Sequence, residues 1–127
     1  MEAFTFTKVI VADLTAASAF YADVFGLEVA QRIEATIDGS PMEEVFLATG
    51  AGPTLALVGY ADREPPVAGE LVLGFSTDDV TSLFDRAAKR GATVVRPPGA
   101  SEATHGYMVG ILADPDGHLV EVVELPA

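Results

Sequence analysis

The C-terminal segment DPDGHLVEVVELP, residues 114–126, carries a carboxylate where a strand should be apolar. Because side chains alternate along a strand, Leu119, Glu121 and Val123 should share one face. Burying an unpaired carboxylate in a dry core costs several kcal/mol. We therefore expect this face to line a hydrated cavity or a ligand pocket. Glu121 could bind a cationic group there, act as a general base, or simply stay hydrated.

Few other residues could take part in catalysis or metal binding. The chain has two histidines and no cysteine, which excludes a thiolate metal site and a cysteine nucleophile. His118 has the opposite parity to Glu121, so the two side chains should point to opposite faces. His105 lies in a THG loop, from which it could lean over a pocket mouth. No glycine-rich phosphate motif, nucleophile elbow or histidine-based zinc motif is present.

An internal repeat organises the elements that must position these residues. Residues 9–29, VIVADLTAASAFYADVFGLEV, resemble residues 75–95, FSTDDVTSLFDRAAKRGATVV, in their order of residue types. Each copy reads as a strand, a capped helix that ends at a glycine, and a second strand. The predicted helix boundaries are Asp13 and Asp79 at the starts and Gly26 and Gly91 at the ends.

Each predicted helix is followed by three strands that are separated by turn residues. The predicted strands after the helices cover residues 27–36, 42–50, 54–60, 92–96, 107–113 and 118–125. With the strand before each helix, the chain becomes two βαβββ modules of an α+β fold. We expect an eight-stranded, cleft-forming mixed sheet with the helices on its outer face. One domain, residues 1–127, would comprise modules 1–61 and 70–127 joined by the linker 62–69.

Composition narrows the choice of partners. Nineteen acidic residues against seven basic ones give a net charge of −12, which disfavours nucleic acid and anionic membranes. A small organic ligand, preferably cationic, suits this charge, although an acidic surface can also serve solubility alone. The start of the chain lacks the pattern of a signal peptide, and no apolar run is long enough to span a membrane. We expect a cytoplasmic location.

The phrases VADLTAASAFYADVFGLEV and DPDGHLVEVVE resemble the vicinal oxygen chelate superfamily, which includes glyoxalase I, bleomycin-resistance proteins, fosfomycin-resistance enzymes and extradiol dioxygenases. In metal-using members, the first strand of each module brings a His or Gln and the last strand brings a Glu. The corresponding positions here hold Phe6 and Val72 in the first strands, and Ala56 and Glu121 in the last strands. Only Glu121 can bind a metal, so the resemblance implies a metal-free member without a cofactor. It also implies a homodimer.

Strand alternation adds further pocket candidates. Glu44 and Phe46 share one face of a strand, and Glu43, Val45 and Leu47 share the other. We take Glu44 and Phe46 to face the cavity, with Tyr107, Arg32, Met108 and Tyr60 as rim candidates. The predicted ligand-binding residues are Phe6, Glu44, Phe46, Ala56, Val72, Tyr107 and Glu121.

Three functions remain open on the residues and the resemblance. The leading prediction is a metal-free protein of the glyoxalase or bleomycin-resistance type that sequesters an antibiotic or a metabolite. The first alternative is a glyoxalase-like or dioxygenase-like lyase or isomerase that uses Zn²⁺, Ni²⁺, Mn²⁺ or Fe²⁺. The second alternative is a metal-free isomerase, cyclase or lyase with Glu121 as its catalytic base. The sequence leaves open whether the protein is an enzyme.

Overall fold

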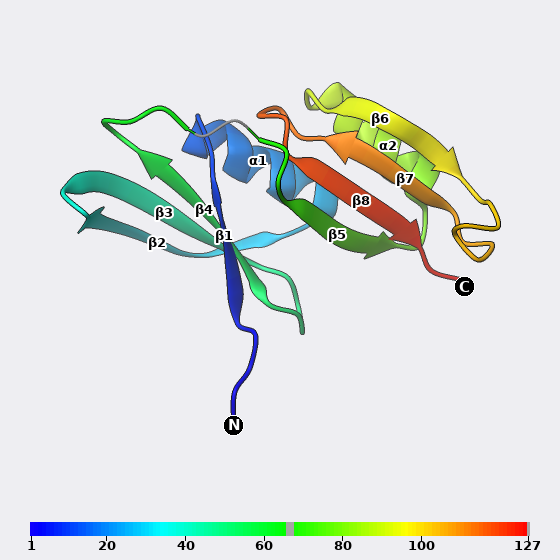
Figure 1. Ribbon diagram of the computed structural model, residues 1–127, viewed down its shortest axis with the longest axis horizontal. Helices are drawn as coiled ribbons and strands as arrows, with labels where there is room; N and C mark the ends of the chain where they lie inside the picture. Colours follow the sequence, from blue (N-terminus) through cyan, green and yellow to red (C-terminus); the bar gives the residue numbers. More distant parts are fainter. Residues whose placement is uncertain (66–67, 127) are drawn as a thin grey trace. The chain divides into compact units, whose positions relative to one another are not determined.

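The computed structural model describes residues 1–65 and 68–126, which divide into two compact units (Figure 1). Unit 1 is Met1–Val67 and unit 2 is Ala68–Ala127. The predicted linker, 62–69, includes residues 66 and 67, which lie outside the described residues. Each unit contains one helix and four strands in the order β-α-β-β-β, as the repeat predicts.

The elements of unit 1 are β1 (Phe6–Ile10), α1 (Leu14–Phe25), β2 (Glu28–Ile37), β3 (Ser40–Ala48) and β4 (Thr54–Tyr60). Those of unit 2 are β5 (Val72–Thr77), α2 (Val80–Lys89), β6 (Thr93–Gly99), β7 (Val109–Ala113) and β8 (Leu119–Glu124). Neither helix is long and apolar enough to cross a membrane, within the part of the chain that the structure describes.

The eight strands form two four-stranded mixed sheets with equivalent strand orders. Unit 1 has the order β1-β4-β3-β2, and unit 2 has the order β5-β8-β7-β6. The first and last strands of each unit run parallel, and the remaining neighbours are antiparallel. The predicted α+β class is confirmed, and the sequence repeat is also a repeat of topology.

Both helices begin where the sequence predicts, and α1 ends at the predicted glycine, whereas α2 ends at Lys89 with Arg90 as its C-cap, one residue before Gly91. The Asp13 carboxylate accepts a hydrogen bond from the Ala16 N–H at 3.0 Å, and Asp79 accepts one from the Ser82 N–H at 3.0 Å. These bonds satisfy backbone donors that the first helical turn leaves unpaired. Gly26, at φ 70°, ends α1 in the left-handed conformation that glycine adopts without strain.

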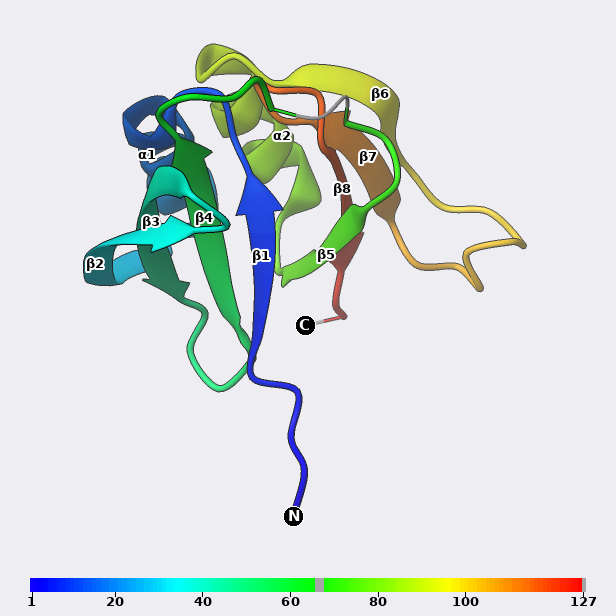
Figure 2. The ribbon, with the colours of Figure 1, turned by 60° about the vertical axis from the view of Figure 1, so that its left-hand side comes forward.

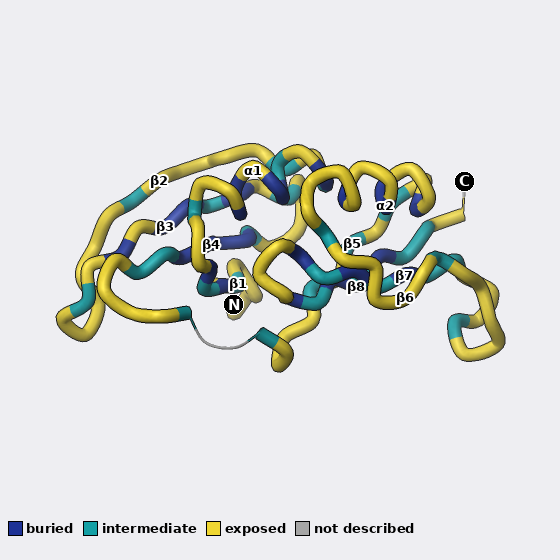
Figure 3. The backbone as a smooth tube through the Cα atoms, turned by 90° about the horizontal axis from the view of Figure 1, so that it is seen from above, coloured by how far each residue is buried: buried dark blue, intermediate teal, exposed yellow. Residues whose placement is uncertain are grey.

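Each helix covers one face of its own sheet (Figure 2). In unit 1 this is the face of Leu57 and Gly59, because a Cβ atom added at Gly59 would lie 3.3 Å from the Leu14 Cβ. In unit 2 it is the face of Gly110 and Leu112. The buried residues lie mainly in the central strands β3, β4, β7 and β8 and on the helix sides that face the sheets. The residues of β2 and β6 are largely exposed (Figure 3). The opposite side of each sheet, which we call its open face, carries no helix of its own unit.

Several strand ends differ from the prediction by one or two residues, and the end of β6 differs most. We expected residues 97–106 to form a loop, but β6 continues through Pro97 and Pro98 to Gly99. Proline cannot donate a backbone hydrogen bond, and it is therefore tolerated mainly in edge strands. β6 lies at the edge of its sheet, and its pairing with β7 shifts between Arg96 and Gly99.

We predict that Gly110→Ala lowers the free energy of unfolding by about 1–3 kcal/mol, because the added methyl group would lie 2.5 Å from the Phe84 Cζ atom in a packed interior. Gly74→Ala is the matched control, since a Cβ at Gly74 meets no atom within 4 Å. The control should change stability by no more than about 0.5 kcal/mol. Urea unfolding checks both variants, and equal stabilities would contradict this account of how α2 packs.

Candidate functional site

The open face of unit 1 gathers most of the residues predicted for the first module. Lys8 on β1 pairs with Ala56 on β4, and Ala56 pairs with Phe46 on β3. Glu44 pairs with Val58 one step further along the same strands. The structure therefore places Glu44 and Phe46 on the open face, opposite the helix-covered face of Gly59. A role for these residues in binding stays a prediction.

The side chains at the first-module positions of the resemblance are hydrocarbon. Phe6 is 49% exposed, which is a large value for an aromatic residue in a strand. Ala56 is fully buried and has only a methyl group. Together with the partly exposed Phe46, these residues make much of the open face of unit 1 apolar.

An ion pair on this face was missed from the sequence. The Lys8 ammonium nitrogen lies 2.9 Å from Oε2 of Glu44. The Glu44 side chain is only 1% exposed, whereas that of Lys8 is 40% exposed. Lys8 and Glu44 lie on strands that both pair with β4, so the lysine side chain reaches across β4 beside the small Ala56. The sequence does not reveal that β4 lies between their two strands, which is what makes them neighbours.

The open face of unit 2 carries the other two predicted strand positions. Glu121 lies between Gly74 on β5 and Ile111 on β7, and Val72 precedes Gly74 on the same face. Glu121 is partly exposed, and its side chain forms no hydrogen bond or ion pair with the described residues. Gly74 has no side chain, and the position of its missing Cβ is open space. These features agree with a hydrated carboxylate and not with a sealed core.

Equivalent pairs of positions on the two open faces carry their charge on opposite strands. In unit 1 the charged Lys8 on the first strand pairs with the small Ala56 on the last strand. In unit 2 the small Gly74 on the first strand pairs with the charged Glu121 on the last strand. Each of these two pairs thus combines a charged side chain with a neighbour too small to cover it.

His118 has a structural role in the turn before β8. Its Nδ1 atom lies 3.1 and 3.0 Å from the two carboxylate oxygens of Asp114. Its backbone N–H also donates to Oδ1 of Asp114 at 2.9 Å. The side chain is nearly buried, and this pairing holds it in the turn and away from Glu121.

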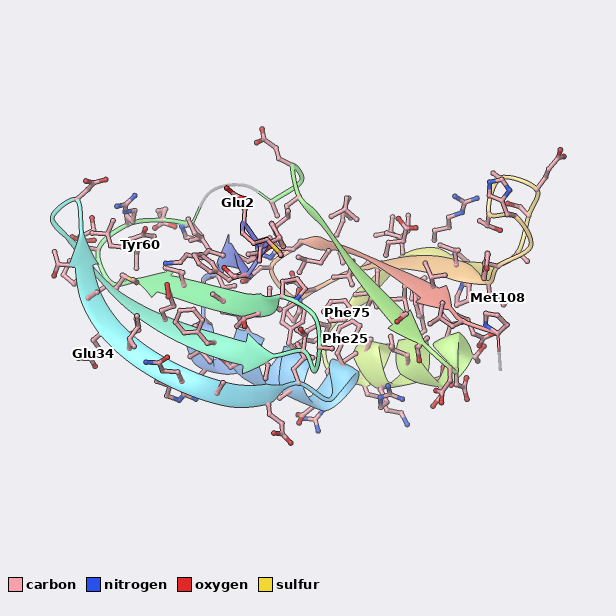
Figure 4. All side chains as sticks on the ribbon, turned by 90° about the horizontal axis from the view of Figure 1, so that it is seen from below. Glu2, Phe25, Glu34, Tyr60, Phe75 and Met108 are labelled. Carbon is pink, nitrogen blue, oxygen red and sulfur yellow. The ribbon has the colours of Figure 1, made fainter. Side chains whose placement is uncertain are left out.

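The rim candidates of unit 2 lie together at the end of β8. His105, Tyr107 and Met108 line a cavity of about 290 Å³ with the end of β8 and the residues after it. Figure 4 shows Met108 in unit 2. His105 adopts a left-handed backbone, at φ 53°, within the preceding turn. Glu121 does not line this cavity, so the structure does not bring Tyr107 and Glu121 into one pocket.

A larger cavity, of about 760 Å³, lies in unit 1 at the start of α1. Its wall includes Asp13, Glu34, Glu43 and Tyr60, and Figure 4 shows Glu34 and Tyr60 at this end of the sheet. None of the predicted ligand-binding residues lines it. Of the rim candidates, Tyr60 does line it. The other lining residues were missed because strand parity assigns a residue to a face of the sheet but does not show where the helix leaves the end of that face uncovered.

The donor set for a metal ion is poor. Among residues 1–65 and 68–126, no group of three or more His, Asp or Glu side chains could hold a metal ion. Catalytic sites for divalent transition metals generally use about three protein ligands.

We predict that Lys8→Met lowers the free energy of unfolding by about 1–3 kcal/mol, because it leaves the buried Glu44 carboxylate unpaired beside a partly solvated site. Glu44→Gln combined with Lys8→Met should recover part of this loss. Lys89→Met, which removes the only other lysine from an exposed position, is the control and should stay within about 0.5 kcal/mol. Equal effects of the two lysine variants in urea unfolding would show that the ion pair contributes nothing.

Comparison with known proteins bears on the whole chain. A relative from Synechocystis sp., named a probable lactoylglutathione lyase, is 27% identical over 93% of this chain and 92% of its own length. A lactoylglutathione lyase of Arabidopsis thaliana is 26% identical over 90% of this chain, which spans 41% of that protein. A variant of glyoxalase I from Zea mays shares the fold with a TM-score of 0.81 at 18% identity, over 98% of this chain and 45% of that one.

The assignment to a family rests on a sequence model that matches residues 3–122. This match includes the strands of both open faces up to Glu121 and both helices. The chain belongs to the Glyoxalase/Bleomycin resistance protein/Dioxygenase superfamily.

Proposed function

We propose that this protein binds a small organic molecule on the open face of one of its sheets and does so without a resident metal ion. The observation that carries this proposal is the hydrocarbon character of Phe6, Ala56 and Val72. These residues occupy positions where the resemblance to metal-using members places metal ligands. None of the three side chains offers an electron pair to a cation, and the exposed Phe6 and Val72 offer apolar contact to a ligand.

The residues present do not fit the divalent metal that this family implies. Of the four expected ligand positions only Glu121 has a donor, and one carboxylate does not hold a catalytic divalent ion tightly. The partner expected at the equivalent position of unit 1 is Ala56, whose methyl group cannot ligate. We therefore route no chemical step through a metal.

Charge and shape suggest the class of ligand. The net charge of −12 attracts cations and repels anions, so a neutral or cationic ligand is favoured over an anionic one. Phe6 and Val72, 49% and 53% exposed, offer apolar surface to a hydrophobic or aromatic body. On the open face of unit 2, Glu121 would bind a donor or cationic group of a ligand that covers Val72. Sequestration of an antibiotic or a metabolite is the biological role that we propose; the homodimer and the cytoplasmic location stay predictions.

A lyase is the second candidate, and the names of two relatives favour it. Glu121 would then be the catalytic base, since its partly exposed carboxylate forms no hydrogen bond or ion pair with the described residues. A base of this kind moves a proton without a metal. The arrangement of Glu121 beside Gly74 leaves room for a substrate carbon to approach it.

Binding is tested by titration calorimetry with a panel of cationic glycopeptide and aromatic antibiotics. For a ligand that binds, Phe6→Ala should weaken affinity roughly five- to thirtyfold, because covering a half-exposed aromatic ring contributes about 1–2 kcal/mol. Val72→Ala should weaken it less. Val95→Ala, at a valine with 54% exposure on the edge strand β6, is the matched control and should leave affinity unchanged. Uniformly absent heat across the panel would count against an antibiotic role.

The two candidates separate in a metal and activity measurement on protein purified without an affinity tag. We expect far less than one equivalent of Zn²⁺, Ni²⁺, Mn²⁺ or Fe²⁺ per chain after dialysis against each ion. One equivalent that disappears in Glu121→Ala would overturn the metal-free proposal. Conversion of lactoylglutathione that is lost in Glu121→Gln, with or without added metal, would establish the lyase in place of a binding protein.

A further inference from the structure

We propose that the Lys8 ammonium, held in place by the buried Glu44 carboxylate, binds a carbonyl oxygen of the ligand on the open face of unit 1. This inference rests on the proposed function and adds a polar contact for the ligand on the open face of unit 1. It assigns Glu44 as a positioning residue and Lys8 as the group that touches the ligand.

Glu44 has the properties of an anchor. Its side chain is 1% exposed, and the Lys8 ammonium is the one partner of its carboxylate among the residues that the structure describes. Its cross-strand neighbours, Ile33 and Val58, are apolar. The Lys8 ammonium at 2.9 Å is the compensating charge. Separating a buried carboxylate from its counter-charge is unfavourable, so Glu44 restrains the end of an otherwise flexible lysine.

Lys8 itself remains available to a ligand. Its side chain is 40% exposed, although its ammonium contacts a buried group. An ammonium has three N–H donors, and one neighbouring carboxylate oxygen leaves others to be used. The Phe6 ring, with its centroid 5.6 Å from the ammonium nitrogen, adds a second contact that orients the cation. A positive charge is thus held among Phe6, Ala56 and Phe46 on an apolar surface.

The same geometry identifies the ligand atom. Lys8 and Glu44 together are neutral, and the whole protein carries −12, so a carboxylate would meet repulsion on approach. A cationic group would need Glu44, but each carboxylate oxygen exposes less than 1 Å². A carbonyl oxygen on a neutral or cationic molecule accepts a hydrogen bond from the ammonium without either penalty. The ligand class is therefore an apolar molecule with a ketone, ester or amide carbonyl.

The test uses two probes of nearly the same shape, acetophenone and α-methylstyrene, in which an oxygen is exchanged for a CH₂ group. Each is titrated into the ¹⁵N-labelled full chain, and amide shifts are followed by NMR. We expect shifts along β1, β3 and β4, with acetophenone bound at least fivefold more tightly. Lys8→Met should bind both probes equally, and Lys89→Met should keep the preference.

The remaining outcomes distinguish this inference from the proposed function. Equal affinity of the unmodified protein for both probes, with shifts on the open face, would overturn the role of Lys8 and leave small-molecule binding in place. A preference that survives in Lys8→Met would also overturn it. No shift with either probe at its solubility limit would overturn both proposals. If Lys8→Met does not fold, the double variant Lys8→Met, Glu44→Gln removes both charges and answers the same question.

Discussion

The whole structure depends on each helix covering one face of a strand pattern that alternates with a period of two. The close approach of α1 to Gly59 and of α2 to Gly110 sets which parity is covered. Once that parity is occupied, every second residue of each strand faces the side without a helix. The residues on that side include exposed ones, such as Phe6 and Val72, and buried ones, such as Glu44.

The open faces show two different ways to keep a carboxylate in a sheet. Glu121 stays partly exposed beside Gly74, where the absence of a side chain leaves room for water or a ligand. Glu44 is buried, and the ammonium of Lys8 compensates its charge. Solvation in one case and ion pairing in the other avoid the cost of an isolated buried charge. The duplicated topology therefore supports two chemically distinct surfaces.

Relationship to metal-using proteins does not by itself supply a metal site. Phe6, Ala56 and Val72 present carbon where ligands would be needed, and a common backbone cannot replace missing electron pairs. Phe6 and Val72 instead add exposed apolar surface to their open faces. On the face of unit 1 the fixed charge comes from a lysine, which places a cation without coordinating ligands.

Much of the fold followed from local chemistry in the sequence. Both helices were predicted from the capping carboxylates of Asp13 and Asp79 and from the glycine at the end of α1. The repeated strand pattern predicted the order of the elements along the chain. These features act between residues close in the chain, so their effect is readable without a three-dimensional structure. Parity also grouped Glu44 with Phe46, and Leu119 with Glu121.

Contacts between distant segments were decided only by the tertiary structure. The pair of Lys8 and Glu44 requires β4 to lie between β1 and β3, and strand order cannot be obtained from the parity of single strands. The continuation of β6 through Pro97 is possible because that strand lies at an edge. Alternation along the chain thus determined which side chains share a face, whereas long-range pairing decided which of them meet, because hydrogen bonds between strands join residues far apart in the sequence.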